Sequence, residues 1–300
     1  MKKKTYLFTL MTMALTLGSC SDNENGIGGE TSKYITVSTS IGNMTRVATD
    51  AKGGQTFEEG DEISVYAWTG APTVAPETSE RVVNNAINKL TNGSWISTPQ
   101  MLWKNNREKH YFIGVYPTAA ISDLSAGEYT FDANKQTESD LLVAVNPDGL
   151  SYNVDEQQPV PLTFTHVMAK LAVNLTYKNQ WGGIPTVEKV VVGNAAKEAT
   201  INYLTKVVTP STTAKEDFSL PEITENTKYV SVIIPQEDVK QLTIVIGGKN
   251  FVYDNGTPFK LESGKITTVN LEVGRDEIKL GDVKITNWED GSTFGGEALN

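Results

Sequence analysis

The chain has 300 residues, of which 39% are hydrophobic and 21% charged, and its formal net charge is −10. A chain of this length is more typical of two domains than of one domain with a single hydrophobic core. Its apolar content is too high for a disordered protein. The acidic balance argues against nucleic acid and anionic membrane surfaces as partners, because clustered Lys and Arg bind both. The single cysteine, Cys20, excludes an intrachain disulfide and a thiolate metal cluster.

Residues 1–19 have the pattern of a secretory signal peptide. Three lysines at positions 2–4 precede an apolar core over residues 6–17, which is too short to span a membrane as a helix. The sequence Leu-Gly-Ser-Cys that ends at Cys20 resembles a bacterial lipobox, in which the cysteine is lipidated and becomes the mature N-terminus. A buried free cysteine is the alternative. Residues 20–32 are polar and rich in glycine, and we expect a flexible tether.

A first β domain is predicted over residues 33–158. Lys33–Ile41 alternates apolar and polar residues, which indicates a short strand. The small and polar stretch 42–54 follows, with one arginine, Arg46, in a loop of the kind that proteases cut. An ordinary solvated arginine is the alternative at this position.

Further strands of the first domain follow a turn at Gly60-Asp61. We expect Asp61 to bind backbone amides of that turn instead of acting in catalysis. Residues 79–90 have helical spacing, but Asn92-Gly93 is a strong hairpin signal, so a hairpin is preferred to a helix. The remaining strand candidates of this domain are 57–67, 111–116, 127–132 and 140–145.

The centre of the chain, Val160–Tyr177, reads as a strand whose apolar phase changes parity between Val167 and Lys170. Either a bulge within one sheet or a strand that leaves one core and joins another would produce this change. The second interpretation is favoured, and it makes this segment the start of a second β domain over residues 159–300.

The second domain is predicted from short strands at close intervals with almost no helical periodicity, which indicates antiparallel β-sandwiches. Gly247-Gly248 predicts a tight hairpin, and the apolar phase shifts at Gly281 within the last strand. The strand candidates are 187–192, 200–204, 228–234, 242–246, 250–253, 266–273 and 278–288.

Catalytic, metal-binding and cofactor-binding patterns are weak, and we predict a protein that is not an enzyme. His110 and His166 are the two histidines, and His166 is expected to be a hydrogen-bonded core residue. Ser263-Gly264-Lys265 lacks the other residues of a phosphate-binding loop, so Gly264 is interpreted as a turn before a strand. An enzyme whose active site uses carboxylates alone is a weaker alternative.

Four motifs give the chain a family resemblance. F-x-H-x-x-A-K-L-x-V spans residues 164–173, F-x-x-G-D-x-I-x-V spans 57–65, an aromatic strand ends in Tyr116-Pro117, and D-L-L-x-A spans 140–144. Together, in their order along the chain, they resemble signatures of the fimbrillin family, the lipoprotein pilins of type V pili.

The resemblance implies two tandem transthyretin-like antiparallel β-sandwich domains. It also implies that an arginine-specific protease removes the first strand by cutting between Arg46 and Val47, and that subunits then join by donating strands. The lipid on Cys20 would anchor the protein at the cell outer membrane, surface-exposed, and the acidic residues after Cys20 resemble a surface-export signal. Partners would be other pilus subunits and, for an adhesin, a host or bacterial surface receptor.

Some alternatives stay open at this point. The last strand, 278–288, is either donated to a neighbouring subunit, as the resemblance implies, or a plain edge strand. A stalk, tip or anchor role is not distinguished by these residues. A surface glycan-binding lipoprotein with a β-sandwich is the rival function, but it would need exposed aromatic residues on one face, and the five tryptophans are scattered along the sequence.

Overall fold

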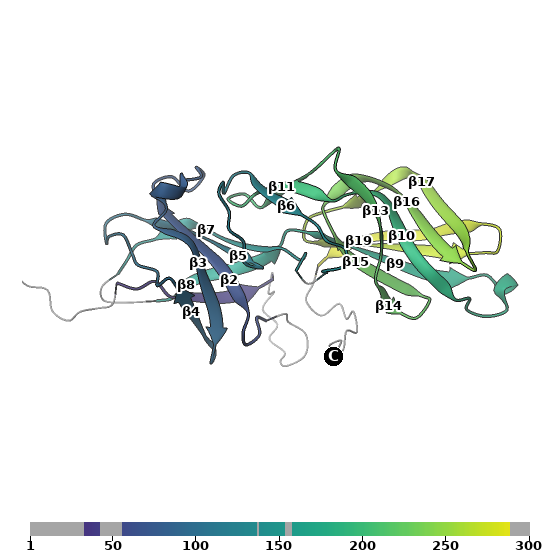
Figure 1. The fold of residues 1–300 in the computed structure, drawn as a ribbon, viewed down its shortest axis with the longest axis horizontal. Helices are drawn as coiled ribbons and strands as arrows, with labels where there is room; N and C mark the ends of the chain where they lie inside the picture. The colour runs from purple at the N-terminus through teal and green to yellow at the C-terminus, as the bar shows by residue number, and fades with distance from the viewer. Residues whose placement is uncertain (1–32, 43–55, 137, 154–157, 289–300) are drawn as a thin grey trace, which may run out of the picture. The chain divides into compact units, whose positions relative to one another are not determined.

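The computed structural model describes residues 33–42, 56–136, 138–153 and 158–288. The described residues belong to one compact unit and form four β-sheets (Figure 1). Their only helical elements are two short 3-10 turns, η1 (Thr78–Glu80) and η2 (Asn179–Trp181). The prediction of an all-β sandwich protein is confirmed.

The largest sheet has seven strands in the order β1-β8-β7-β5-β2-β3-β4. Its neighbouring strands are antiparallel except for β1 and β8, which are parallel. The strands are β1 (Val37–Ile41), β2 (Glu62–Thr69), β3 (Val83–Thr91), β4 (Ser94–Thr98), β5 (His110–Tyr116), β7 (Leu142–Leu150) and β8 (Val160–His166).

This sheet curls until its two outer strands meet. The Trp95 indole Nε1 on β4 donates a hydrogen bond to Thr39 Oγ1 on β1 over 3.0 Å. Just before β1, Tyr34 forms an isolated antiparallel bridge with Leu102, which follows β4. The curled sheet encloses a core of its own, because alternate side chains of each strand point to the same side. That core contains Ile35, Val37, Ile41, Ile63, Val65, Ala67, Val83, Ala86, Met101, Phe112, Leu142, Ala144, Val160, Leu162 and Phe164.

The predicted turns of this region are confirmed. Asn92 and Gly93 have φ values of 50° and 72°, which are the left-handed angles of a tight hairpin, and they connect β3 to β4. Residues 83–91 are therefore a strand and not a helix. Asp61 Oδ2 accepts a hydrogen bond from the Glu58 backbone amide over 2.7 Å, as expected of a turn residue.

The central segment crosses from one sheet to another. β8 ends at His166 beside β7 and β1, and β9 begins at Ala169 beside β15 and β18. The parity change between Val167 and Lys170 is therefore the crossing that we favoured. The predicted domain boundary at residues 158 and 159 stays a prediction.

Two further sheets face each other across the larger core. The first has the order β14-β15-β9-β18-β19 and the second has the order β13-β10-β16-β17. Within the first sheet β9 and β18 are parallel, and the other pairs are antiparallel. The strands are β9 (Ala169–Tyr177), β14 (Glu222–Thr224), β15 (Lys228–Ile233), β18 (Lys265–Val273), β19 (Ile278–Asn287), β10 (Val187–Ala196), β13 (Lys215–Ser219), β16 (Gln236–Ile246) and β17 (Lys249–Leu261).

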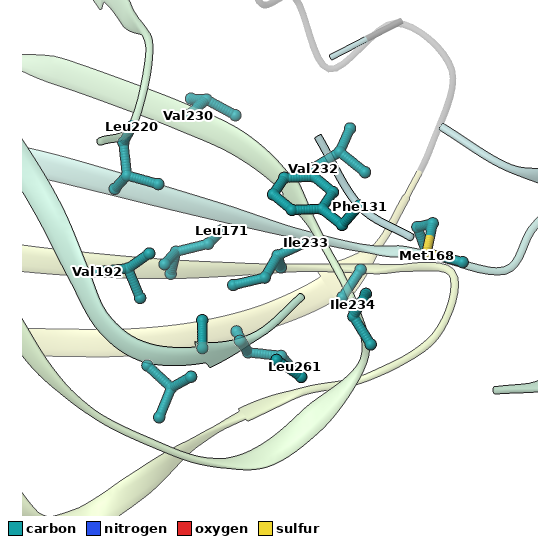
Figure 2. Close-up of a cluster of buried hydrophobic side chains, with 14 of the residues drawn as sticks. Phe131, Met168, Leu171, Val192, Leu220, Val230, Val232, Ile233, Ile234 and Leu261 are labelled. Atoms are coloured by element: carbon teal, nitrogen blue, oxygen red, sulfur yellow. The ribbon is translucent and has the colours of Figure 1, made fainter. Parts of the chain in front are cut away.

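Figure 2 shows part of this larger core, with Phe131, Met168 and aliphatic side chains from several strands. Leu171 of β9 lies there with Ile233 of β15 and Val192 of β10, so the core includes residues from both facing sheets. Tyr66 and Trp68, on the opposite side of β2 from Val65, belong to the same larger core. β2 is consequently buried on both faces.

The fourth sheet joins segments that are far apart in the sequence. It contains β6 (Gly127–Thr130), β11 (Glu198–Asn202) and β12 (Val207–Pro210) in the order β12-β11-β6. Gly127 of β6 pairs with Ile201 of β11. A Cβ atom on Gly127 would lie 2.5 Å from the ring of Tyr203, so this close approach needs glycine.

The strands that the sequence analysis missed are β12, β13 and β14. β13 has the sequence Lys-Glu-Asp-Phe-Ser, and of its five residues only Phe218 is buried. β14 is exposed throughout. Their strand structure comes from pairing with β11, β10 and β15, which a hydrophobic pattern does not reveal.

Gly114 in β5 supports a prediction about packing. A Cβ atom at this position would lie 2.6 Å from Cζ of Phe164 and 3.1 Å from Leu162. We expect Gly114→Ala to lower the free energy of unfolding by about 1–3 kcal/mol, because the added methyl group overpacks the core. Gly256→Ala is the control, since a Cβ atom there meets nothing within 4 Å. Equal midpoints in chemical denaturation for both variants would contradict this prediction.

Candidate assembly site

β1 is the last strand at one end of its sheet. The segment that contains it nevertheless has backbone hydrogen bonds on both sides. Along one side it pairs in parallel with β8, from Val37 opposite Val160 to Ile41 opposite Phe164. The Gly42 amide donates to the Phe164 carbonyl over 2.9 Å. On the other side, the Ile35 amide donates to the Met101 carbonyl over 2.9 Å. The N-terminal strand therefore fills a gap between β8 and the chain that follows β4.

The side chains of residues 35–41 alternate between the core, on whose side Thr39 is half-buried, and solvent. Ile35, Val37 and Ile41 are buried, whereas Ser38 and Ser40 are exposed. Burial of each aliphatic side chain contributes about 1.5–3 kcal/mol relative to exposure in water. The strand thus contributes substantially to the core of the seven-stranded sheet although it lies at the edge of that sheet.

Aromatic rings from separate motifs lie together in this core. The ring of Phe57 contacts the rings of Trp95, Tyr116 and Phe164 edge to face, at centroid distances of 5.3, 5.4 and 5.1 Å. Such edge-to-face pairs are a favoured aromatic geometry. Burial and, next, the Asp61 carboxylate raise the pKa of Tyr116, which keeps its hydroxyl protonated. We call Phe57, Trp95, Tyr116 and Phe164 the aromatic seat.

The predicted processing site lies outside the described residues. Arg46 and Val47 fall in the stretch 43–55, between Gly42 and the start of the segment that holds Phe57. Cys20 also lies outside the described residues. The predictions of cleavage and lipidation at these positions therefore stay predictions.

The last strand, β19, is also an edge strand, but it differs from β1 in the burial of its side chains. It pairs with β18 from Lys265 opposite Asn287 to Val273 opposite Ile278, with an irregularity that confirms the predicted phase shift near Gly281. Its apolar side chains are partly exposed, with 37% for Leu280 and 38% for both Val283 and Ile285. β19 therefore has many backbone contacts, but its apolar side chains are less deeply buried than those of β1.

The two histidines are structural residues. His166 is buried and its Nδ1 lies 2.9 Å from Asp140 Oδ1, as expected of a hydrogen-bonded core histidine. His110 is fully buried, and its Nε2 accepts a hydrogen bond from the Lys104 amide over 3.1 Å. Burial lowers the pKa of His110, which favours the neutral ring.

Among the described residues, no group of three or more His, Cys, Asp or Glu side chains is arranged to hold a metal ion. Two open hollows have volumes of about 610 and 680 Å³. The first lies beside Lys206 and Pro235, and the second beside Arg81 and Trp103. Neither hollow is lined by a histidine or a cysteine, and the first is lined in part by Glu237, Asp238 and Glu262.

All five tryptophans are buried or half-buried. The indole of Trp181 donates to the Val273 carbonyl over 3.0 Å, and Trp103 packs edge to face on His110 and Phe112. Within the part of the chain that the structure describes, no helix has the length and apolar character needed to cross a bilayer.

The sequence of this chain matches that of a known protein family. The sequence model of a family described as fimbrillin-like matches residues 45–288. This span includes the whole aromatic seat and Trp288. No curated protein sequence matches the chain significantly.

Solved structures with a similar fold come from Bacteroides species. A proposed cell adhesion protein from Bacteroides ovatus aligns with a TM-score of 0.62 and 18% identity, over 85% of this chain and 98% of the other. A proposed cell adhesion protein from Bacteroides uniformis gives 0.61 and 17%, over 86% and 100%. A fimbrial protein from Bacteroides vulgatus gives 0.51 and 12%, over 84% and 99%. At these identities the likeness shows a shared fold.

The burial of β1 generates a prediction about stability. Ile35→Ala should lower the free energy of unfolding by about 2–4 kcal/mol, because it removes a buried side chain and leaves a cavity in the gap between β8 and the chain that follows β4, which we call the seam. Ser40→Ala, on the exposed side of the same segment, should stay within about 0.5 kcal/mol of the original protein. Urea denaturation of both variants measures the difference. A loss of stability as small for Ile35→Ala as for Ser40→Ala would show that the strand is not part of the cooperative core.

Proposed function

The chain belongs to the fimbrillin-like family, and we propose that it is a fimbrial subunit that joins other pilus subunits by strand exchange. Membership of a fimbrial and cell-adhesion family supports the general assignment. The single observation that carries the finer proposal is the position of β1, which is peripheral in its sheet yet buries alternate side chains in its core.

The first step is removal of the N-terminal strand. Cleavage after Arg46 would separate β1 from the rest of the chain, so that only noncovalent contacts would retain it. Its departure would uncover Leu162 and Phe164 of β8 and leave backbone groups of β8 without partners. Unpaired backbone groups and exposed apolar side chains are both costly, so the open seam would have a strong tendency to take another strand.

The second step is occupation of the seam by a strand of another subunit. The incoming strand would need apolar side chains where Ile35, Val37 and Ile41 now lie, with polar residues between them. Main-chain hydrogen bonds would provide affinity, and the alternating side chains would provide specificity. Because donor and acceptor are different surfaces of each subunit, such joints are heterologous and would extend into a fibre wherever the rotation between subunits does not close a ring.

β19 suits the role of donor. It is an edge strand at the end of the described chain, it pairs with one neighbour, β18, and it carries alternating apolar residues that are only partly covered. Release of β19 would therefore expose less new apolar surface than release of a central strand.

Lipidation of Cys20 and surface exposure complete the proposal. A lipid on Cys20 would hold the protein at the outer membrane during export, and residues 21–32 would then act as a tether. The division into an N-terminal sandwich over 33–158 and a C-terminal sandwich over 159–300 belongs to the same proposal. None of these steps requires a catalytic group or a cofactor in the subunit.

Cleavage at Arg46 is tested with purified protein and an arginine-specific protease. The expected result is a new N-terminus at Val47, followed by polymers that resist SDS. Arg46→Ala is the control and should remain uncut and monomeric. Of the described arginines, Arg81 is only 8% exposed, whereas Arg107 and Arg275 are exposed. Cleavage that begins at Arg107 or Arg275, with Arg46 intact, would contradict the proposed processing.

Lipid attachment is tested by growing cells with a fatty acid that carries a chemical tag. The unsubstituted protein should become labelled and fractionate with membranes, because two or more acyl chains hold a protein stably at a bilayer. Cys20→Ser should lose the label and leave the membrane fraction. Retention of Cys20→Ser in membranes would mean that another segment provides the anchor.

A further inference from the structure

Trp288 is the one buried residue in the otherwise exposed stretch 275–288. Its side chain is 8% exposed, whereas Ile278 is half-buried and the other residues of this stretch are exposed. The residue directly follows β19, which ends at Asn287. The C-terminal end of β19 is therefore fixed by a contact of a different kind from the backbone ladder along the strand.

The indole of Trp288 lies in a site made by the segment that crosses between the sheets. Its ring stacks on the ring of His166, with a centroid distance of 4.0 Å and an angle of 8° between the planes. The Lys170 ammonium lies 3.9 Å from the centroid of the indole ring. Stacking and a cation over the ring face both stabilise an aromatic side chain.

The site is itself rigidly held. Asp140 Oδ1 lies 2.9 Å from His166 Nδ1 and fixes the imidazole from the side of β7. The backbone amide of Trp288 donates to the Gly264 carbonyl over 3.0 Å, and the Gly264 amide donates to the Met168 carbonyl over 2.8 Å. The indole, the turn before β18 and the sheet crossing are thus connected by direct contacts.

We propose that Trp288 is a clip that keeps β19 closed on its own subunit, and that withdrawal of the indole from His166 and Lys170 is the event that frees the strand. The reason is the distribution of burial. β19 has exposed side chains and a single neighbouring strand, so its ladder can open from the end at Asn287 once the indole leaves. The inference rests on the proposed function only in taking the freed strand to be a donor.

The other end of β19 has a weaker attachment. Glu277, just before the strand, forms surface ion pairs with Lys178 and Lys279. Exposed ion pairs contribute little to stability and are screened by salt. In this proposal Trp288 is the side-chain contact that keeps the ladder of β19 closed, and Glu277 marks the turn about which the strand would open.

Hydrogen exchange of the unprocessed monomer, read by mass spectrometry, tests the clip without any assembly. Trp288→Ala should accelerate exchange of β19 amides by about 10- to 100-fold, because the stacking and cation contacts that oppose local opening are lost. Amides of β5, in the seven-stranded sheet, should keep their original rates. Ile285→Ala is the matched control, since Ile285 lies on the same strand but is 38% exposed, and should change β19 exchange less than threefold, by about the amount expected of a surface substitution.

Two further variants keep the test decisive if Trp288→Ala does not fold. Trp288→Phe retains a stacking ring, and Lys170→Met retains the aliphatic stem while removing the charge, so each should give a smaller acceleration confined to β19. Unchanged β19 exchange in these variants would overturn the clip, as would equal acceleration in β5, which would make Trp288 a residue of global stability. Polymer formation after processing is a separate readout, and its failure with a normally opening β19 would count against the proposed function alone.

Discussion

The crossing at Val167 and Met168 is the constraint on which the rest of the structure depends. Both residues are almost completely buried, and they connect the last residue of β8 directly to the first residue of β9. β8 is the strand that holds β1, and β9 is parallel to β18, the neighbour of β19. His166 lies at this crossing and contacts Trp288. A few consecutive residues therefore position both of the strands on which the proposed assembly relies.

β1 and β19, the first and last strands of the described chain, differ in the contacts that attach them to their sheets. β1 has five residues in its ladder but buries alternate side chains, so its attachment is mainly hydrophobic. β19 has ten residues in a long ladder but exposed side chains, so its attachment is mainly through the backbone and Trp288. A seam that loses β1 lacks apolar filling, and β19 carries apolar side chains that are partly covered. The proposed strand exchange requires this complementarity.

Much of the fold could be predicted from the sequence, because alternation and turn residues are local signals. The Asn92-Gly93 hairpin, the Gly60-Asp61 turn and the parity change after Val167 each depend on a few neighbouring residues. Strands such as β13 and β14 could not be predicted, since their polar side chains reflect solvent exposure and their structure depends on distant partners. The aromatic seat was hidden for a related reason: Phe57 and Phe164 are far apart in the sequence, and only the folded sheet brings their rings together. The alternation of side chains predicted β1 as a strand. No pattern in the sequence predicted that β1 pairs in parallel with β8.

The pairing of β6 with β11 has a consequence for the order in which the molecule is made. β6 ends at Thr130, and its partner strand begins at Glu198, well after the seven-stranded sheet has been completed by β8. A nascent chain that has emerged only as far as β8 thus carries β6 with an open edge and nothing yet synthesised to cover it. Folding of this region has to wait for later residues, and until then β6 is a strand edge that other chains could capture.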